Sequence, residues 1–80
     1  MKTLTKSNLS LYLFEDDVSV VMTTENITVG DPAKFMILDC NSENTVLHTG
    51  APKPKHWYGH KYTYDGTTWA LVADWVDPRL

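Results

Sequence analysis

His56 and His60 are the first residues in the chain whose types and spacing could hold a metal ion. On a helix the two imidazoles would share one face, but Gly59 lies between them and Pro52 and Pro54 precede them, which disfavours a helix. On a strand they would share a face about 13 Å apart, which is too far for one ion. A metal site needs three or four ligands. We therefore expect no metal and no other cofactor, and place both histidines at the surface.

Cys40 is the only cysteine, so no disulfide can form within the chain. It could act as a nucleophile with a histidine as its base. However, it follows Asp39 at the end of an apolar run and lacks the electropositive setting that lowers a thiol pKa. We expect a small buried hydrophobic residue instead. The sequence contains no phosphate-binding loop and no nucleophile elbow, and we predict no catalytic residue and no enzyme.

Two groups of acidic residues could do acid–base work or bind calcium. The first is Glu15 with Asp16 and Asp17, and the second is Asp74 with Asp77. Neither group has the spacing of a calcium loop, so we interpret them as a turn and a solvated tail over 74–80.

Aromatic residues are the features that most suggest binding, because such side chains stack on sugars and anchor protein interfaces. Tyr62, Tyr64 and Trp69 belong to a predicted strand pair, so we assign them to the interior or to a subunit contact. The residues outside the clearest strands are the candidates for an interface or a ligand site, and they are Trp57, Tyr58, Trp75, His56 and His60.

Alternating apolar residues indicate the strands that must position these side chains. Leu9, Leu11 and Leu13 alternate with other residues, and the same pattern resumes after Asp16-Asp17. A two-residue turn there would place Leu13 opposite Val20 on one buried face, which predicts an N-terminal hairpin over 8–23.

A second hairpin is predicted over 60–72, around a type I′ turn at Asp65-Gly66. In that register Tyr64 faces Thr67 and Tyr62 faces Trp69.

The middle of the chain contains shorter strand signals. Residues 27–29 form one strand, which Gly30-Asp31-Pro32 ends. Residues 34–40 are apolar on both sides and predict a central strand covered on both faces, and residues 45–49 predict another. A Pro-rich loop over 50–55 follows. These elements predict a single all-β domain over 1–80, a small barrel or sandwich of about six or seven antiparallel strands.

Composition excludes several classes of protein. The net charge of −3 disfavours a nucleic-acid binder, because phosphate contacts need clustered Lys and Arg. No run approaches the ~20 apolar residues of a membrane helix. The apolar run 9–14 is too short for a signal peptide. We therefore expect a soluble, cytoplasmic protein that binds neither nucleic acid nor membranes.

The C-terminal segment 57–69, Trp-Tyr-Gly-His-Lys-Tyr-Thr-Tyr-Asp-Gly-Thr-Thr-Trp, and the stretch 74–78 resemble short proteins of marine tailed phages, a cyanophage-like family without an established activity. Residues 8–14 and 26–31 fit the same resemblance. It implies a virion or assembly component, located in the virion, and it implies no catalytic residues.

These observations predict a non-enzymatic structural or protein-interaction module. Its expected partner is a second copy of itself, in a homo-oligomer, or another structural protein. The alternative is a small module that binds carbohydrate on an aromatic platform, and the third hypothesis is a small enzyme that uses Cys40 or the histidines.

Overall fold

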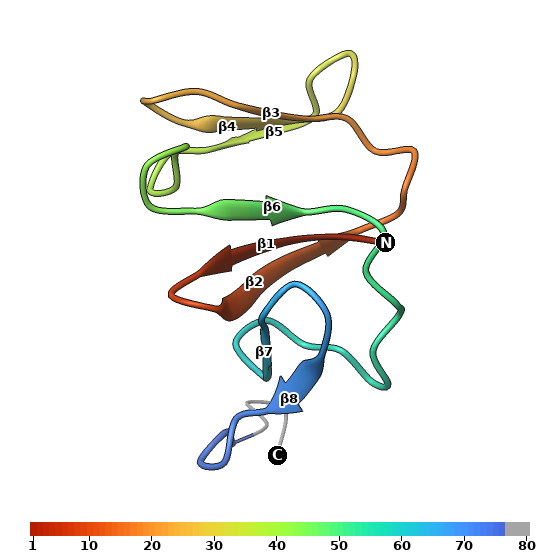
Figure 1. Ribbon diagram of the computed structural model, residues 1–80. Helices are drawn as coiled ribbons and strands as arrows, with labels where there is room; N and C mark the ends of the chain where they lie inside the picture. The colour runs from red at the N-terminus through yellow and green to blue at the C-terminus, as the bar shows by residue number, and fades with distance from the viewer. Residues whose placement is uncertain (77–80) are drawn as a thin grey trace.

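Eight antiparallel β-strands form two sheets in the computed structural model, which describes residues 1–76. The order β6-β1-β2-β7-β8 makes a five-stranded sheet, and β3-β4-β5 makes a three-stranded one (Figure 1). The predicted all-β class is confirmed. No helix in the described range is long and apolar enough to cross a membrane. The strands are β1 (Lys2–Lys6), β2 (Leu9–Phe14), β3 (Val20–Met22), β4 (Ile27–Val29), β5 (Phe35–Ile37), β6 (Val46–His48), β7 (Tyr62–Tyr64) and β8 (Trp69–Leu71).

The three-stranded sheet is a meander of consecutive strands rich in β-branched residues, which favour extended backbone. Val29 of β4 pairs with Val20 on one side and with Phe35 on the other. The predicted strand at 27–29 is confirmed. It ends at Gly30, whose φ of +97° is a conformation that glycine adopts without strain.

The hydrophobic core lies between the two sheets (Figure 1). Leu4, in β1 of the five-stranded sheet, and Ile27, in β4 of the three-stranded sheet, are both completely buried. The rings of Phe14 and Phe35 extend this contact, with centroids 6.3 Å apart. Burial of apolar surface is the main force that holds the two layers together. The buried members of the cluster are Leu4, Ile27, Val29, Ile37 and Cys40.

The predicted N-terminal hairpin over 8–23 is wrong, because β2 and β3 belong to different sheets. β2 pairs instead with β1, a strand that was not predicted. Ser7 and Asn8 connect the two with φ values of +52° and +66°, and type I′ hairpin turns require positive φ at both positions. Asp16-Asp17 therefore lies on the connection from one sheet to the other.

A register irregularity in β1–β2 changes which side chains are buried. Leu4 pairs with Tyr12 but Thr5 pairs with Ser10, so Leu11 is an extra residue, as in a β-bulge. The predicted buried row of leucines is wrong. Leu11 is half-buried, whereas Ser10 is completely buried.

β5 also differs from its prediction as a central strand over 34–40. It has three residues and lies at an edge of its sheet. Ile37 faces the core, but Phe35, Met36 and Leu38 are exposed. A run of apolar residues does not itself show which faces are covered, because exposed apolar side chains are common on protein surfaces.

The predicted C-terminal hairpin is present, but its register is shifted. Tyr64 pairs with Trp69, and Tyr62 pairs with Leu71. Positions 65–68 thus form a four-residue loop rather than a two-residue turn. The cause is the Asp65 carboxylate, which accepts the backbone N–H of Thr68 at 2.8 Å.

Candidate functional site

The predicted candidates at 56–60 lie on the long connection between β6 and β7, after the Pro-rich loop. Trp57 is half-buried, and its indole Nε1 donates a hydrogen bond to Ser10 Oγ at 3.0 Å. Because Ser10 is completely buried in β2, this bond fastens the connection to the five-stranded sheet. Trp57 therefore makes a structural contact through the edge of its indole ring.

The Trp57–Ser10 contact belongs to a chain of hydrogen bonds with a fixed direction. Thr3 Oγ1 donates to the carbonyl oxygen of Tyr12 at 2.8 Å, and Thr3 Oγ1 and Ser10 Oγ lie 2.7 Å apart. Each hydroxyl has one proton, so Ser10 must donate to Thr3 and accept from Trp57. Every polar group in this chain is thereby satisfied, which explains how two buried hydroxyls are tolerated.

Tyr58, Lys61 and Trp75 form a compact cluster at the surface. The rings of Tyr58 and Trp75 are 5.9 Å apart, with an angle of 53° between their planes. Lys61 Nζ lies 5.1 Å from the centroid of the Trp75 ring and donates to the carbonyl oxygen of His56 at 2.9 Å. The two rings are not coplanar and an ammonium group already contacts one of them, which disfavours a flat platform for a sugar ring.

The side chains of His56 and His60 are both exposed, and both residues have left-handed backbone, with φ of +52° and +71°. The backbone N–H of His60 donates to the carbonyl oxygen of Ser10 at 2.9 Å. Within residues 1–76, no three His, Cys, Asp or Glu side chains group closely enough to hold a metal ion. The hydrogen bond from the His60 backbone attaches the connection to β2.

A small pocket of about 220 Å³ brings together Cys40, His60 and Asp39, with Tyr58 beside them. These are the residue types of a nucleophile, a base and an acid, and sequence spacing gave no sign that they meet. No hydrogen bond in the described part of the chain joins the Cys40 thiol to His60. Cys40 is 1% exposed and belongs to the core cluster, as expected for a small buried hydrophobic residue. The arrangement lacks the nucleophile–base contact that covalent catalysis needs.

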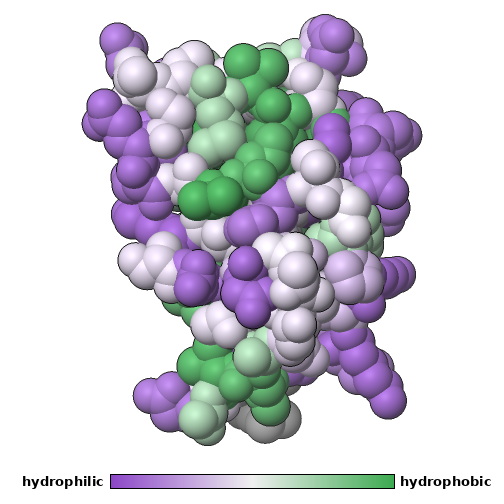
Figure 2. Space-filling model, viewed as in Figure 1, coloured by the Kyte–Doolittle hydropathy of each residue, from purple (hydrophilic) through white to green (hydrophobic). Residues whose placement is uncertain are grey.

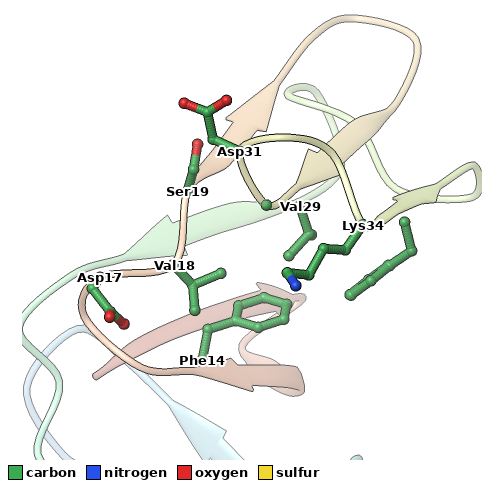
Figure 3. A pocket seen from close by; sticks show the side chains of 9 residues that line it. Phe14, Asp17, Val18, Ser19, Val29, Asp31 and Lys34 are labelled. Carbon is green, nitrogen blue, oxygen red and sulfur yellow. The ribbon is translucent and has the colours of Figure 1, made fainter.

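A larger groove, of about 380 Å³, opens where the two sheets meet (Figure 3). Its apolar walls come from Phe14, Val18, Val29 and Phe35, and its polar members are Asp17, Ser19, Asp31 and Lys34. None of these was a predicted site residue. They come from separate segments, around 14–19, 29–31 and 34–35, which the fold brings together and no local motif could reveal.

The face of the three-stranded sheet that points away from the core, here called the outer face, carries a row of uncharged side chains, of which the two outer ones are apolar. Val21, Thr28 and Met36 are paired neighbours across β3, β4 and β5, and Leu38 follows two positions after Met36. Val21 and Met36 are 53% and 52% exposed, and Leu38 is 74% exposed. Figure 2, which views the two sheets from the side, shows an apolar region in the upper part of the molecule, at the level of this sheet.

Two further apolar side chains toward the C-terminus, Leu71 of β8 and Val76, are 61% and 77% exposed. Residues 77–80, including Asp77 of the predicted tail, lie outside the described part of the chain.

Comparisons with family models, with curated proteins and with solved structures find no match to this chain.

Proposed function

We propose that this protein is a non-enzymatic structural and protein-interaction module that assembles with copies of itself through the outer face of its three-stranded sheet. The observation that supports this most directly is the row of Val21, Thr28 and Met36, in which Val21 and Met36 are exposed and Thr28 is half-buried. Leu38, two positions after Met36, is exposed as well. Contiguous apolar side chains on a small protein are typical of interaction surfaces.

The row itself carries no charge that would oppose a second copy on this surface. The chain has a net charge of −3, so two copies repel each other at long range. The row of Val21, Thr28 and Met36 contains no charged residue, and two copies can meet there without placing like charges together. Completely burying a Val, Leu or Met side chain contributes about 1.5–3 kcal/mol, which offsets part of the cost of association.

Strand edges add to this argument. Within the described residues β3 and β5 are the two edges of the sheet, and each has backbone groups that another strand could pair with. An 80-residue chain has a small core, and oligomerisation is one of the ways in which such domains gain buried area.

The resemblance to proteins of marine tailed phages suggests a setting for such assembly. In this proposal the chain is made in the cytoplasm and becomes part of a virion or acts during its assembly, with itself or another structural protein as the partner. Detection of the chain by mass spectrometry in purified phage particles would test whether it is a virion component. This test does not depend on whether the chain self-associates.

Light scattering over a concentration series tests the assembly. We expect a discrete oligomer for the natural sequence and a dissociation constant at least about tenfold higher for Met36→Lys, because burying an ammonium group is costly. Thr68→Lys, which adds the same charge to the C-terminal hairpin loop, is the control and should leave the oligomer unchanged. A natural chain that stays monomeric up to millimolar concentration would contradict the proposal.

Carbohydrate binding is the second candidate. Trp57, Tyr58 and Trp75 are only half-buried and none belongs to the core cluster, so ring surface is accessible at this site. Titration with a glycan panel, followed by tryptophan fluorescence, tests it. A saturable change that Trp75→Ala removes would support binding, and no change with any glycan would exclude this candidate.

A further inference from the structure

The groove between the sheets has two aromatic walls that belong to different layers. Phe14 ends β2 in the five-stranded sheet, and Phe35 begins β5 in the three-stranded sheet. Their ring planes are tilted by 41°. Val18 and Val29 complete an apolar surface, and the volume of about 380 Å³ falls in the range of small-molecule sites.

Lys34 supplies the positive charge in this groove. Figure 3 shows its side chain extending across the groove toward the Phe14 ring. Its ammonium group forms no hydrogen bond or salt bridge within residues 1–76. Lys2, by contrast, donates to the carbonyl oxygen of Val18 at 2.7 Å. The Lys34 ammonium is thus available to pair with an anion beside an apolar surface.

Two carboxylates at the margin of the groove limit the number of negative charges that a bound anion can carry. Asp17 and Asp31 line the groove, and neither forms a salt bridge with Lys34. In Figure 3 the Asp31 carboxylate points away from the Phe14 ring. Like-charge repulsion from these two residues disfavours a ligand with several negative charges, whereas a single carboxylate can reach the ammonium group.

We propose that this groove binds a small monocarboxylate with an apolar body. The carboxylate pairs with the Lys34 ammonium in a charge-assisted hydrogen bond, and the apolar body contacts Phe14 and Phe35. The inference is independent of self-association, because it uses the groove at the junction of the sheets and not the outer face.

An NMR titration with 3-phenylpropionate tests the proposal, with 3-phenylpropanamide as a neutral ligand of the same shape. We expect the acid to shift the backbone amides of Gly30 and Phe35 and to bind about tenfold more tightly than the amide. Lys34→Met keeps the aliphatic stem and removes the charge. It should weaken acid binding about tenfold and leave amide binding unchanged. Lys55→Met, which removes an exposed lysine outside the groove, should bind the acid as the natural chain does.

Equal binding of acid and amide by the natural chain would overturn the proposal, as would unchanged acid binding in Lys34→Met. The absence of shifts at Gly30 and Phe35 with ~20 mM acid would also overturn it. Thermal unfolding checks that Lys34→Met is folded, and Lys34→Gln replaces it if it is not. Repeating the titration in Met36→Lys separates this result from any failure of self-association.

Discussion

Ser10 and Trp57 are 47 positions apart in the sequence, yet Ser10 Oγ accepts the indole N–H of Trp57 at 3.0 Å. Leu4 points into the core, so its neighbour Thr3, which contacts Ser10, points to the opposite face of the five-stranded sheet. That face is covered by the connection that carries Trp57. On the core side of the five-stranded sheet the packing is apolar, as at Leu4. On the opposite side the connection is held to the sheet by the hydroxyl groups of Thr3 and Ser10.

Ser10→Ala should lower the free energy of unfolding by about 1–3 kcal/mol, because it leaves the Trp57 N–H without an acceptor and removes the donor to Thr3. Urea denaturation measures the change. The control is Ser42→Ala at an exposed position, which should change stability by less than about 0.5 kcal/mol. Combining Ser10→Ala with Trp57→Phe should cost less than the sum of the two single changes. Additive effects would show that the two side chains are not coupled.

The stability of the C-terminal hairpin should depend on acid pH through Asp65. The backbone N–H groups of Thr68 and Thr67, and the Thr67 hydroxyl, donate to its carboxylate and hold its pKa below the usual value of 3.8. Because the pKa is lower in the folded chain than in the unfolded one, the carboxylate stabilises the fold above about pH 4. That contribution is lost as the pH falls through the folded-state pKa.

Thermal unfolding between pH 2 and pH 7 measures this effect. The melting temperature of the natural chain should exceed that of Asp65→Asn at neutral pH, and the difference should narrow below about pH 4. Glu43→Gln, at an exposed position whose side chain accepts no such bonds, should follow the natural chain throughout. A difference that stays constant at every pH would show that the Asp65 charge does not contribute.

Two glycines with positive φ should respond very differently to alanine. A Cβ at Gly30 would lie 3.0 Å from both Lys34 N and Pro32 O, which are backbone atoms and cannot move easily. At Gly50 a Cβ would meet nothing within 4 Å. We therefore expect Gly50→Ala to cost about 1–2 kcal/mol for the left-handed backbone alone, and Gly30→Ala to cost about 2–4 kcal/mol. Urea denaturation of both variants tests this, and a larger loss for Gly50→Ala would contradict it.

The all-β class, the strand at 27–29 and the C-terminal hairpin could be predicted because each has a local cause, in alternation or in turn chemistry. β1 could not, because Thr3 and Thr5 suggest an exposed strand. Both are buried, and their partners lie on other strands: the Thr5 hydroxyl contacts His48 Nε2 at 3.1 Å. The hairpin register was missed because it depends on where the Asp65 side chain bonds.

The candidate site was predictable only in part. Tyr58 and Trp75 were selected together, and the structure places their rings in contact. Trp57 was predicted as an interface or ligand candidate, but the Ser10 hydroxyl that it contacts cannot be recognised from local sequence. The groove around Lys34 was missed altogether, since its walls meet only after the two sheets have packed.

The order in which the chain leaves and re-enters the five-stranded sheet has a consequence for folding kinetics. β3, β4 and β5 are consecutive in sequence, so their meander closes only short loops. The pairing of β1 with β6, in which Leu4 meets Leu47, must close a loop that contains the whole meander. Loop-closure entropy makes long-range pairing the slower step. We expect β1 to remain a free edge until late, so a chain that stalls at this stage presents its N-terminal strand to any neighbouring molecule.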